Sequence, residues 1–158
     1  YDIGCYPTVI SRYLLDKEPK RVVATSVIDK KFKTDILSTA LLDFGGIYSS
    51  FTVATQSNKS QQVVILGTKK TIIVENPFNA EPSKKSNIIV YNGKSIYRKE
   101  NTIKTFSATD QYEHQATAFS EHLLKKTKVD YDLKDAKKNM KVLDAIFKSI
   151  KKGQWTKV

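Results

Sequence analysis

The sequence lacks residues and patterns on which several classes of protein depend. Cys5 is the only cysteine among 158 residues, which excludes an internal disulfide and a cysteine-based zinc cluster. No apolar run approaches the roughly 20 residues that a membrane-spanning helix needs. This cysteine usage fits a reducing, cytoplasmic compartment. Because the sequence begins at Tyr1 rather than at methionine, it does not allow a signal peptide to be judged.

Patterns that bind nucleotides and metals are also missing. No G-x-G-x-x-G precedes an expected helix, and Gly45-Gly46 lies between two expected strands. The two histidines, His114 and His122, lie on one helical stretch, and no third metal ligand accompanies them. We therefore expect surface or core-edge histidines and no metal site.

Arginine is scarce in a chain that is otherwise strongly basic. The net charge is +11, but Arg12, Arg21 and Arg98 are the only arginines among 27 basic residues. Bidentate recognition of phosphates and bases favours arginine, and the lysines are scattered rather than interleaved with aromatic residues. A basic module for nucleic acid or an anionic membrane is the alternative interpretation. A solvated, lysine-rich surface fits better, so we expect neither partner.

The residues that are present form an ordered series of helical and β-rich segments. Helical spacing predicts a helix over residues 3–15, which ends at Lys17-Glu18-Pro19. Two further helical stripes run from Tyr112 to Leu123 and from Leu133 to Ile150, before Gly153. Between the first helix and these two, strands are predicted at residues 21–29, 35–44, 47–55, 61–66, 71–75, 88–91, 95–98 and 103–106.

Consecutive hairpins followed by helices predict an α+β fold in one domain, residues 1–158. We expect an open, mainly antiparallel sheet with helices packed on one face. Strands such as 36–44 carry apolar residues on both faces, and helices can cover only one of them. The other face is therefore predicted to pack against a partner subunit, in a homodimer or higher homo-oligomer, or against another domain.

Asp2 and Tyr6 are the strongest candidates for chemistry. On a helix, their spacing of four places a carboxylate and a phenol about one turn apart on one face. Such a pair can exchange a proton with a substrate hydroxyl. The structural alternatives are an N-cap role for Asp2 and a core position for Tyr6. For Cys5 we expect a small buried hydrophobe rather than a reactive thiol.

The segment Asp2–Pro7 resembles the motif at the start of the C-terminal domain of the Gfo/Idh/MocA family of oxidoreductases. Taken together, the motifs of this resemblance cover nearly the whole chain in the family's order. One departure is Lys70, where the family usually has a glycine at the turn. The further motifs follow in the family's order: Glu18-Pro19 before a strand, Asp35 with Phe44-Gly45-Gly46, Ile65–Lys69, Asn76–Phe78, Tyr112-x-x-Gln115-x-x-x-Phe119, Met140–Ile146 with Ser149, and Gly153–Trp155.

The resemblance implies a two-domain enzyme whose C-terminal domain has a glyceraldehyde-3-phosphate dehydrogenase-like fold. An N-terminal Rossmann domain, absent from this chain, would bind NAD or NADP. The present domain would supply the substrate wall and the oligomer interface. The family transfers a hydride between nicotinamide and a sugar, polyol or diol, so the fragment alone is expected to be inactive. The alternative is a non-catalytic dimeric binding or scaffold domain that lacks the Rossmann half.

The resemblance also implies roles for individual residues. The motif aspartate corresponds to Asp2 and the acid/base residue to Tyr6, where many members have histidine. Tyrosine is typical of the branch with glucose–fructose oxidoreductase and dihydrodiol or xylose dehydrogenases. A free tyrosine loses its proton only near pH 10, so a tyrosine base needs a nearby cation. The family's cation is a lysine in a Glu-Lys-Pro motif of the Rossmann domain, which this chain lacks. Gln115 is expected to face the substrate pocket or, equally, the helix surface.

Overall fold

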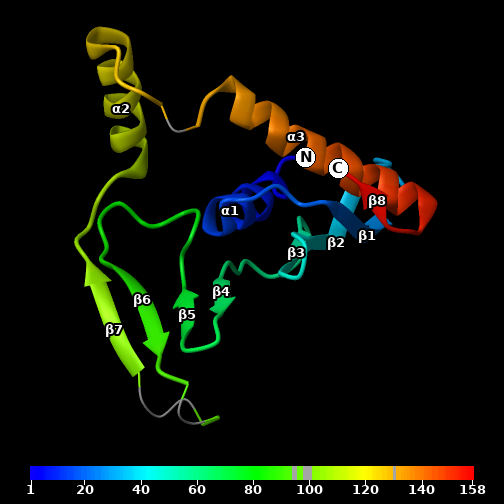
Figure 1. The fold of residues 1–158 in the computed structure, drawn as a ribbon, viewed down its shortest axis with the longest axis horizontal. Coiled ribbons are helices and arrows are strands. Elements are labelled where there is room, and N and C mark those ends of the chain that lie inside the picture. Colours follow the sequence, from blue (N-terminus) through cyan, green and yellow to red (C-terminus); the bar gives the residue numbers. More distant parts are fainter. Residues whose placement is uncertain (94–95, 98–100, 130) are drawn as a thin grey trace. The chain divides into compact units, whose positions relative to one another are not determined.

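A computed structural model describes residues 1–93, 96–97, 101–129 and 131–158 (Figure 1). Within these residues the chain forms three helices and eight strands. The helices are α1 (Cys5–Leu15), α2 (Gln111–Lys125) and α3 (Leu133–Lys152). The strands are β1 (Arg21–Ile28), β2 (Asp35–Asp43), β3 (Tyr48–Ala54), β4 (Val63–Leu66), β5 (Thr71–Val74), β6 (Ser86–Tyr91), β7 (Asn101–Phe106) and β8 (Thr156–Lys157).

The chain divides into two compact units. The first comprises Tyr1–Asn58 with Asp130–Val158, and the second comprises Lys59–Val129. Each unit holds one four-stranded sheet, with strand order β3-β2-β1-β8 in the first and β4-β5-β6-β7 in the second. All of these strand pairs are antiparallel. The predicted α+β class with antiparallel sheets is confirmed, and the strands are divided between two sheets.

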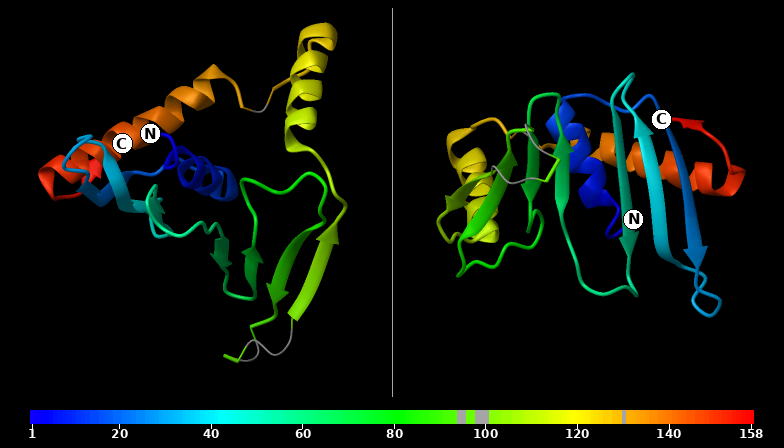
Figure 2. Two further views of the ribbon diagram at one scale, coloured as in Figure 1. Left: turned by 180° about the vertical axis from the view of Figure 1, so that it is seen from behind. Right: turned by 90° about the horizontal axis from the view of Figure 1, so that it is seen from below.

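Helices α1 and α3 lie on one face of the first sheet (Figures 1 and 2). Successive side chains of a strand point to opposite faces, so Val23 and Leu41 stand on the face away from these helices. This arrangement matches the predicted packing of helices on one side. The core between the sheet and α3 consists of Val22, Ala40, Leu42, Phe44, Val142, Leu143, Ala145 and Ile146.

Glycines make two of the turns in the first unit. Gly45 and Gly46, with φ of 84° and 98°, join β2 to β3 in the predicted hairpin. Gly153 ends α3 with φ of 63°, and its N–H donates to the Ser149 carbonyl. Both places need a left-handed backbone, which glycine adopts without a Cβ penalty.

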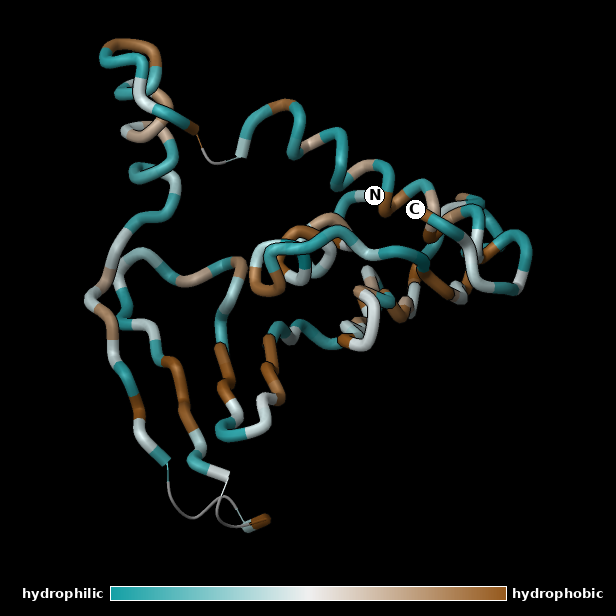
Figure 3. The backbone as a smooth tube through the Cα atoms, in the orientation of Figure 1, coloured by the Kyte–Doolittle hydropathy of each residue, from teal (hydrophilic) through white to brown (hydrophobic). Residues whose placement is uncertain are grey.

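The second unit contains the β4–β5 hairpin and the longer strands β6 and β7. Apolar residues run along β4, β5 and β6, as Figure 3 shows. In the β4–β5 turn the Gly67 N–H donates to the Lys70 carbonyl, and Lys70 needs no positive φ. A lysine at the position where the family usually has glycine is therefore compatible with this turn.

Strand β6 pairs with β7 across the register Tyr91↔Asn101. Strand β7 forms an edge of its sheet, as predicted for residues 103–106. The hairpin strand predicted at residues 95–98 is wrong at Ile96 and Tyr97, which lie in a turn, while Ser95 and Arg98 lie outside the described residues. None of the helices in the described ranges combines the length and apolar character needed to cross a bilayer.

Candidate functional site

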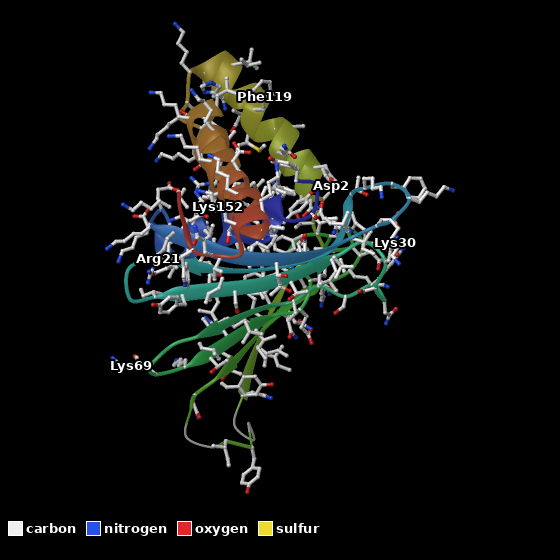
Figure 4. The ribbon with its side chains drawn as sticks, turned by 90° about the vertical axis from the view of Figure 1, so that its right-hand side faces the viewer. Asp2, Arg21, Lys30, Lys69, Phe119 and Lys152 are labelled. Atoms are coloured by element: carbon white, nitrogen blue, oxygen red, sulfur yellow. The ribbon has the colours of Figure 1, made fainter. Side chains whose placement is uncertain are left out.

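The two candidate residues lie at the start of α1, but only Tyr6 belongs to the helix. The helix begins at Cys5, and Gly4 is its N-cap without a side-chain cap hydrogen bond. Asp2 lies in the turn that precedes the helix and is exposed (Figure 4). The structure therefore does not support the N-cap role for Asp2. Asp2 and Tyr6 therefore do not share a face of one helix: Asp2 lies in the preceding turn, and Tyr6 lies in the first turn of α1.

Tyr6 is 46% exposed and borders a hollow of about 310 Å³ between α1 and the beginning of α3. Its exposure argues against the alternative of a core aromatic. The wall of the hollow mixes apolar atoms with carboxylates and one amide, which can orient a polar ligand. The residues around it are Cys5, Tyr6, Val9, Tyr131, Asp132, Asp135, Ala136 and Asn139.

A second hollow of about 340 Å³ lies further along α1 and is more highly charged. Tyr13 and Tyr131 form an edge-to-face pair at its border, with ring centroids 6.0 Å apart. Both hollows share Tyr131 and Asp135, so they adjoin along the beginning of α3. This second hollow is lined by Val9, Arg12, Tyr13, Asp16, Lys17, Glu18, Tyr131, Asp135 and Lys138.

Arg12 is the central charge between the two helices and is only 5% exposed. Its Nε and Nη2 donate to the two carboxylate oxygens of Glu18 at 2.7 and 3.0 Å. Its Nη2 also donates to Asp135 Oδ1 at 2.5 Å, which ties the end of α1 to the start of α3. The bidentate bond from Arg12 holds the pKa of Glu18 below its ordinary value, against the opposing effect of burial.

Asn139 connects this cluster to the backbone that carries Tyr6. Its Oδ1 accepts from Arg12 Nη1 at 3.4 Å, and its Nδ2 donates to the Cys5 carbonyl at 3.2 Å. Our sequence reasoning did not identify Arg12 or Asn139 as parts of the site. One signal in the sequence could have identified Asn139. It lies one helical turn before the buried pair Val142 and Leu143, so a polar residue occupies a position where the helical period predicts an apolar one.

Tyr1 fastens the other end of the same segment to α3. Its hydroxyl donates to Asp144 Oδ1 at 2.8 Å, and its ring stacks on Phe147 with centroids 4.5 Å apart. The hydrogen bond to Asp144, with smaller effects of burial and the carboxylate charge, raises the pKa of the Tyr1 phenol. Tyr1 is therefore a structural anchor that stays protonated near neutral pH.

Cys5 is half-buried and packs against the core of the first unit. Its Sγ donates to the Asp2 carbonyl at 3.0 Å. Burial, followed by the nearby Asp2 carboxylate, raises the pKa of the Cys5 thiol. These features agree with a small packed residue and disfavour a thiolate nucleophile.

Gln115 and the two histidines lie on α2 in the second unit; Gln115 and His114 are exposed, and His122 is half-buried. His114 Nε2 and Thr109 Oγ1 are hydrogen-bonded at 2.6 Å, and His122 Nδ1 contacts the Thr127 carbonyl. Among the described residues, no group of three or more His, Cys, Asp or Glu side chains is arranged to hold a metal ion. The role of Gln115 in substrate binding stays a prediction.

Among the described residues, none of those that line the hollow beside Tyr6 is basic. The three basic residues of the second hollow, Arg12, Lys17 and Lys138, are matched there by Asp16, Glu18 and Asp135. Figure 4 shows Lys30 at the tip of the β1–β2 hairpin and Lys152 at the end of α3, in separate parts of the first unit. The guanidinium of Arg21 pairs with Asp43 at 2.8 Å and lies over the Trp155 ring. In the first unit, this agrees with the scattered, solvated lysines expected from the sequence.

Residues 1–73 match the GFO/IDH/MocA C-terminal domain. Over 159 aligned residues the chain is 35% identical to an uncharacterized oxidoreductase of Rhizobium meliloti, covering 100% of this chain and 48% of that protein. The chain thus spans about half the length of the curated relative that it matches. The predicted resemblance to the Gfo/Idh/MocA family is confirmed.

Solved structures share the fold at low sequence identity. An aldose-aldose oxidoreductase from Caulobacter crescentus, complexed with glycerol, matches with a TM-score of 0.80 and 18% identity over 98% of this chain and 46% of that chain. A 3-ketoreductase from Actinomadura kijaniata, in complex with TDP-benzene and NADP, matches with a TM-score of 0.83 and 16% identity over 94% of this chain and 46% of that chain. These likenesses establish the fold.

Proposed function

We infer, from the match to the GFO/IDH/MocA C-terminal domain, that this chain is the substrate-binding half of a nicotinamide-dependent oxidoreductase. The substrate class that we propose is a sugar, polyol or diol. Support comes from the oxidoreductase relative and from the two solved structures, one named for aldoses and the other complexed with NADP. The observation that carries the proposal is the family motif placing an exposed Tyr6 beside a hollow of about 310 Å³.

The chemistry assigned to this chain is proton transfer. A carbinol carbon loses hydride only as its hydroxyl loses a proton, so the Tyr6 Oη would take that proton, or return it in the reverse direction. Asp2, in the adjoining turn, would hold the substrate hydroxyl or orient Tyr6. The nicotinamide, when bound, would supply the redox step.

The cofactor would be held mainly by a Rossmann domain outside this chain. Gly45 and Gly46 join two antiparallel strands, whereas a dinucleotide-binding turn joins a strand to a helix. Whether the cofactor is NAD or NADP would then be set by that domain. We further propose a cytoplasmic location, which the single cysteine supports, and assembly as a homodimer through the sheet face away from α1 and α3.

Two variants, Tyr6→Phe and its control Tyr13→Phe, test the assignment of proton transfer to Tyr6. In the full-length protein, Tyr6→Phe should lower kcat roughly 10²- to 10⁴-fold for oxidation of D-glucose or D-xylose, because the ring stays while the proton acceptor is lost. Reduced nicotinamide is measured by absorbance with both NAD and NADP. Cofactor affinity should be nearly unchanged.

The matched control is Tyr13→Phe. Tyr13 lies on the same helix and is 61% exposed, so it tests the loss of a phenol hydroxyl elsewhere on α1. This variant should keep near-normal turnover. Near-full activity of Tyr6→Phe would contradict the catalytic role of Tyr6.

A further inference from the structure

The segment that carries Asp2 and Tyr6 is held by α3 at both of its ends. Tyr1 is fixed by Asp144 and Phe147, and the Cys5 carbonyl accepts from Asn139. Between these points the backbone passes close to α3: a Cβ at Gly4 would lie 3.6 Å from Leu143 Cδ2. The position of Tyr6 therefore depends on contacts with a helix more than 130 residues away in sequence, since Asn139 and Cys5 are 134 positions apart.

The direction of the Asn139 amide is determined by its neighbours. Arg12 has only donors, so the Asn139 oxygen must face it, at 3.4 Å from Nη1. The NH₂ group must then face the Cys5 carbonyl, which accepts at 3.2 Å. A flipped amide would place an oxygen against a carbonyl and an NH₂ group against a guanidinium. This side chain therefore has one satisfied orientation.

Arg12 is itself held in place, and its fixed Nη1 donor determines where the Asn139 oxygen lies. Glu18 engages it through two hydrogen bonds, and Asp135 adds a third at 2.5 Å. These hydrogen bonds to two carboxylates leave little rotational freedom to a guanidinium that is 5% exposed. The series Glu18, Arg12, Asn139 and the Cys5 carbonyl is therefore continuous.

We propose that Asn139 is a positioning residue for Tyr6, an inference that rests on the proposed function. The Cys5 carbonyl lies in the same planar peptide unit as the Tyr6 nitrogen and Cα. Fixing this carbonyl fixes the direction in which the Tyr6 side chain leaves the backbone. Tyr6 and Asn139 also border the same hollow of about 310 Å³, so a rotation of this peptide would move the phenol relative to a bound substrate.

The discriminating variant is Asn139→Asp. It keeps an oxygen for Arg12 and nearly the same size, but it puts a second oxygen where the donor to Cys5 stood. The matched control is Lys141→Gln, since Lys141 is exposed on the same helix. Both substitutions change the charge of α3 by the same amount, and only the first removes the hydrogen bond.

The first measurement needs no substrate. NMR of this chain with isotope-labelled tyrosine rings, with the Tyr6 signal assigned by its loss in Tyr6→Phe, reports the ring's surroundings directly. The Tyr6 signal should shift or broaden in Asn139→Asp and stay unchanged in Lys141→Gln. An unchanged Tyr6 signal in both variants would overturn the inference, whatever the activity of the enzyme.

The second measurement is a double-mutant cycle in the full-length protein, with D-glucose and D-xylose as probes. Asn139→Asp should lower kcat roughly 10- to 100-fold with little change in KM. In a Tyr6→Phe background it should cause no further loss, because it acts through Tyr6. Equal losses in both backgrounds would reject positioning and leave the proposed function intact. A fully active Tyr6→Phe enzyme would reject the proposed function itself, and the NMR result would then stand alone.

Discussion

At the scale of single residues, Arg12 determines how α1 meets α3. A guanidinium stays charged at any pH at which the protein folds, yet this one is only 5% exposed. Burial of a charge is tolerated when it is paired and hydrogen-bonded, and Glu18 and Asp135 supply both conditions. The contribution of Arg12 to the free energy of unfolding can be measured by replacing it with an uncharged residue.

Arg12→Met should lower the free energy of unfolding by about 3 kcal/mol, because two carboxylates lose their shared cation at a partly buried site. Chemical denaturation followed by circular dichroism measures the change. Arg21→Met is the matched comparison, since Arg21 also pairs with a carboxylate but its side chain is 49% exposed. Its loss should be distinctly smaller. Equal losses would contradict a special role for the buried cluster.

The same pair makes stability depend on pH. The pKa of Glu18 is lowered in the folded state by Arg12, so its stabilisation is complete above the unfolded value of roughly 4.3. As pH falls below that value the unfolded chain takes up the proton first, and the stabilisation disappears as pH passes the folded pKa. Denaturation curves from about pH 3 to 7 should show a smaller fall for Arg12→Met than for the unmodified chain.

At the scale of elements, Ser149 joins the end of α3 to the edge of β1. Strand β8 pairs with β1 only at Arg21 and Val22, so the Ala24 N–H lies beyond the last paired residue. The fully buried Ser149 hydroxyl accepts from that N–H at 3.0 Å and donates to the Gln154 carbonyl at 2.7 Å. One side chain thus completes a strand edge and orders the chain after the helix.

Ser149→Ala should lower the free energy of unfolding by about 1–3 kcal/mol, since it leaves the partly buried Ala24 N–H without its acceptor. The control is Ser120→Ala on α2, where an exposed hydroxyl donates to the Ala116 carbonyl of its own helix. That change should stay within roughly 0.5 kcal/mol. Thermal and chemical denaturation would both register the difference, and similar losses would argue against this function of Ser149.

At the scale of the whole molecule, the first sheet has a second face that its own helices do not cover. Its rows follow from the strand register: Val23 opposite Leu41, and Val27 opposite Leu37. Between these apolar rows lies a threonine row, where the Thr39 and Thr52 hydroxyls are 2.9 Å apart. A face of this composition suits a second copy of the same sheet, which is the basis of the proposed dimer.

Leu41→Lys should shift the chain towards monomer, because the charge would have to be buried at the centre of the proposed interface. Light scattering during size-exclusion chromatography, over a range of concentrations, measures the mass. The control is Leu14→Lys on α1, where the leucine is 44% exposed. A chain that is monomeric before any substitution, or a Leu41→Lys variant that stays dimeric, would contradict an interface at this face.

The sequence alone determined the three helices and most of the strands, because their signals are local, whereas the two-residue strand β8 was not predicted. Helical spacing and Gly153 located α3, and Gly45-Gly46 between alternating segments located the β2–β3 hairpin. The family motif in the segment Asp2–Pro7 also identified Asp2 and Tyr6 as candidates, and their catalytic roles stay predictions. Each of these signals extends over a few residues, where backbone propensity and side-chain period dominate.

The tertiary structure decided which distant residues meet. Arg12 reaches Asp135 across 123 positions, and Tyr1 reaches Asp144 across 143. It also divided the strands between two sheets and began α1 at Cys5, which left Asp2 in a turn. No periodicity encodes such contacts, because they depend on how whole elements pack once the chain has closed long loops. For that reason the polar connection through Asn139 emerged only from the folded chain.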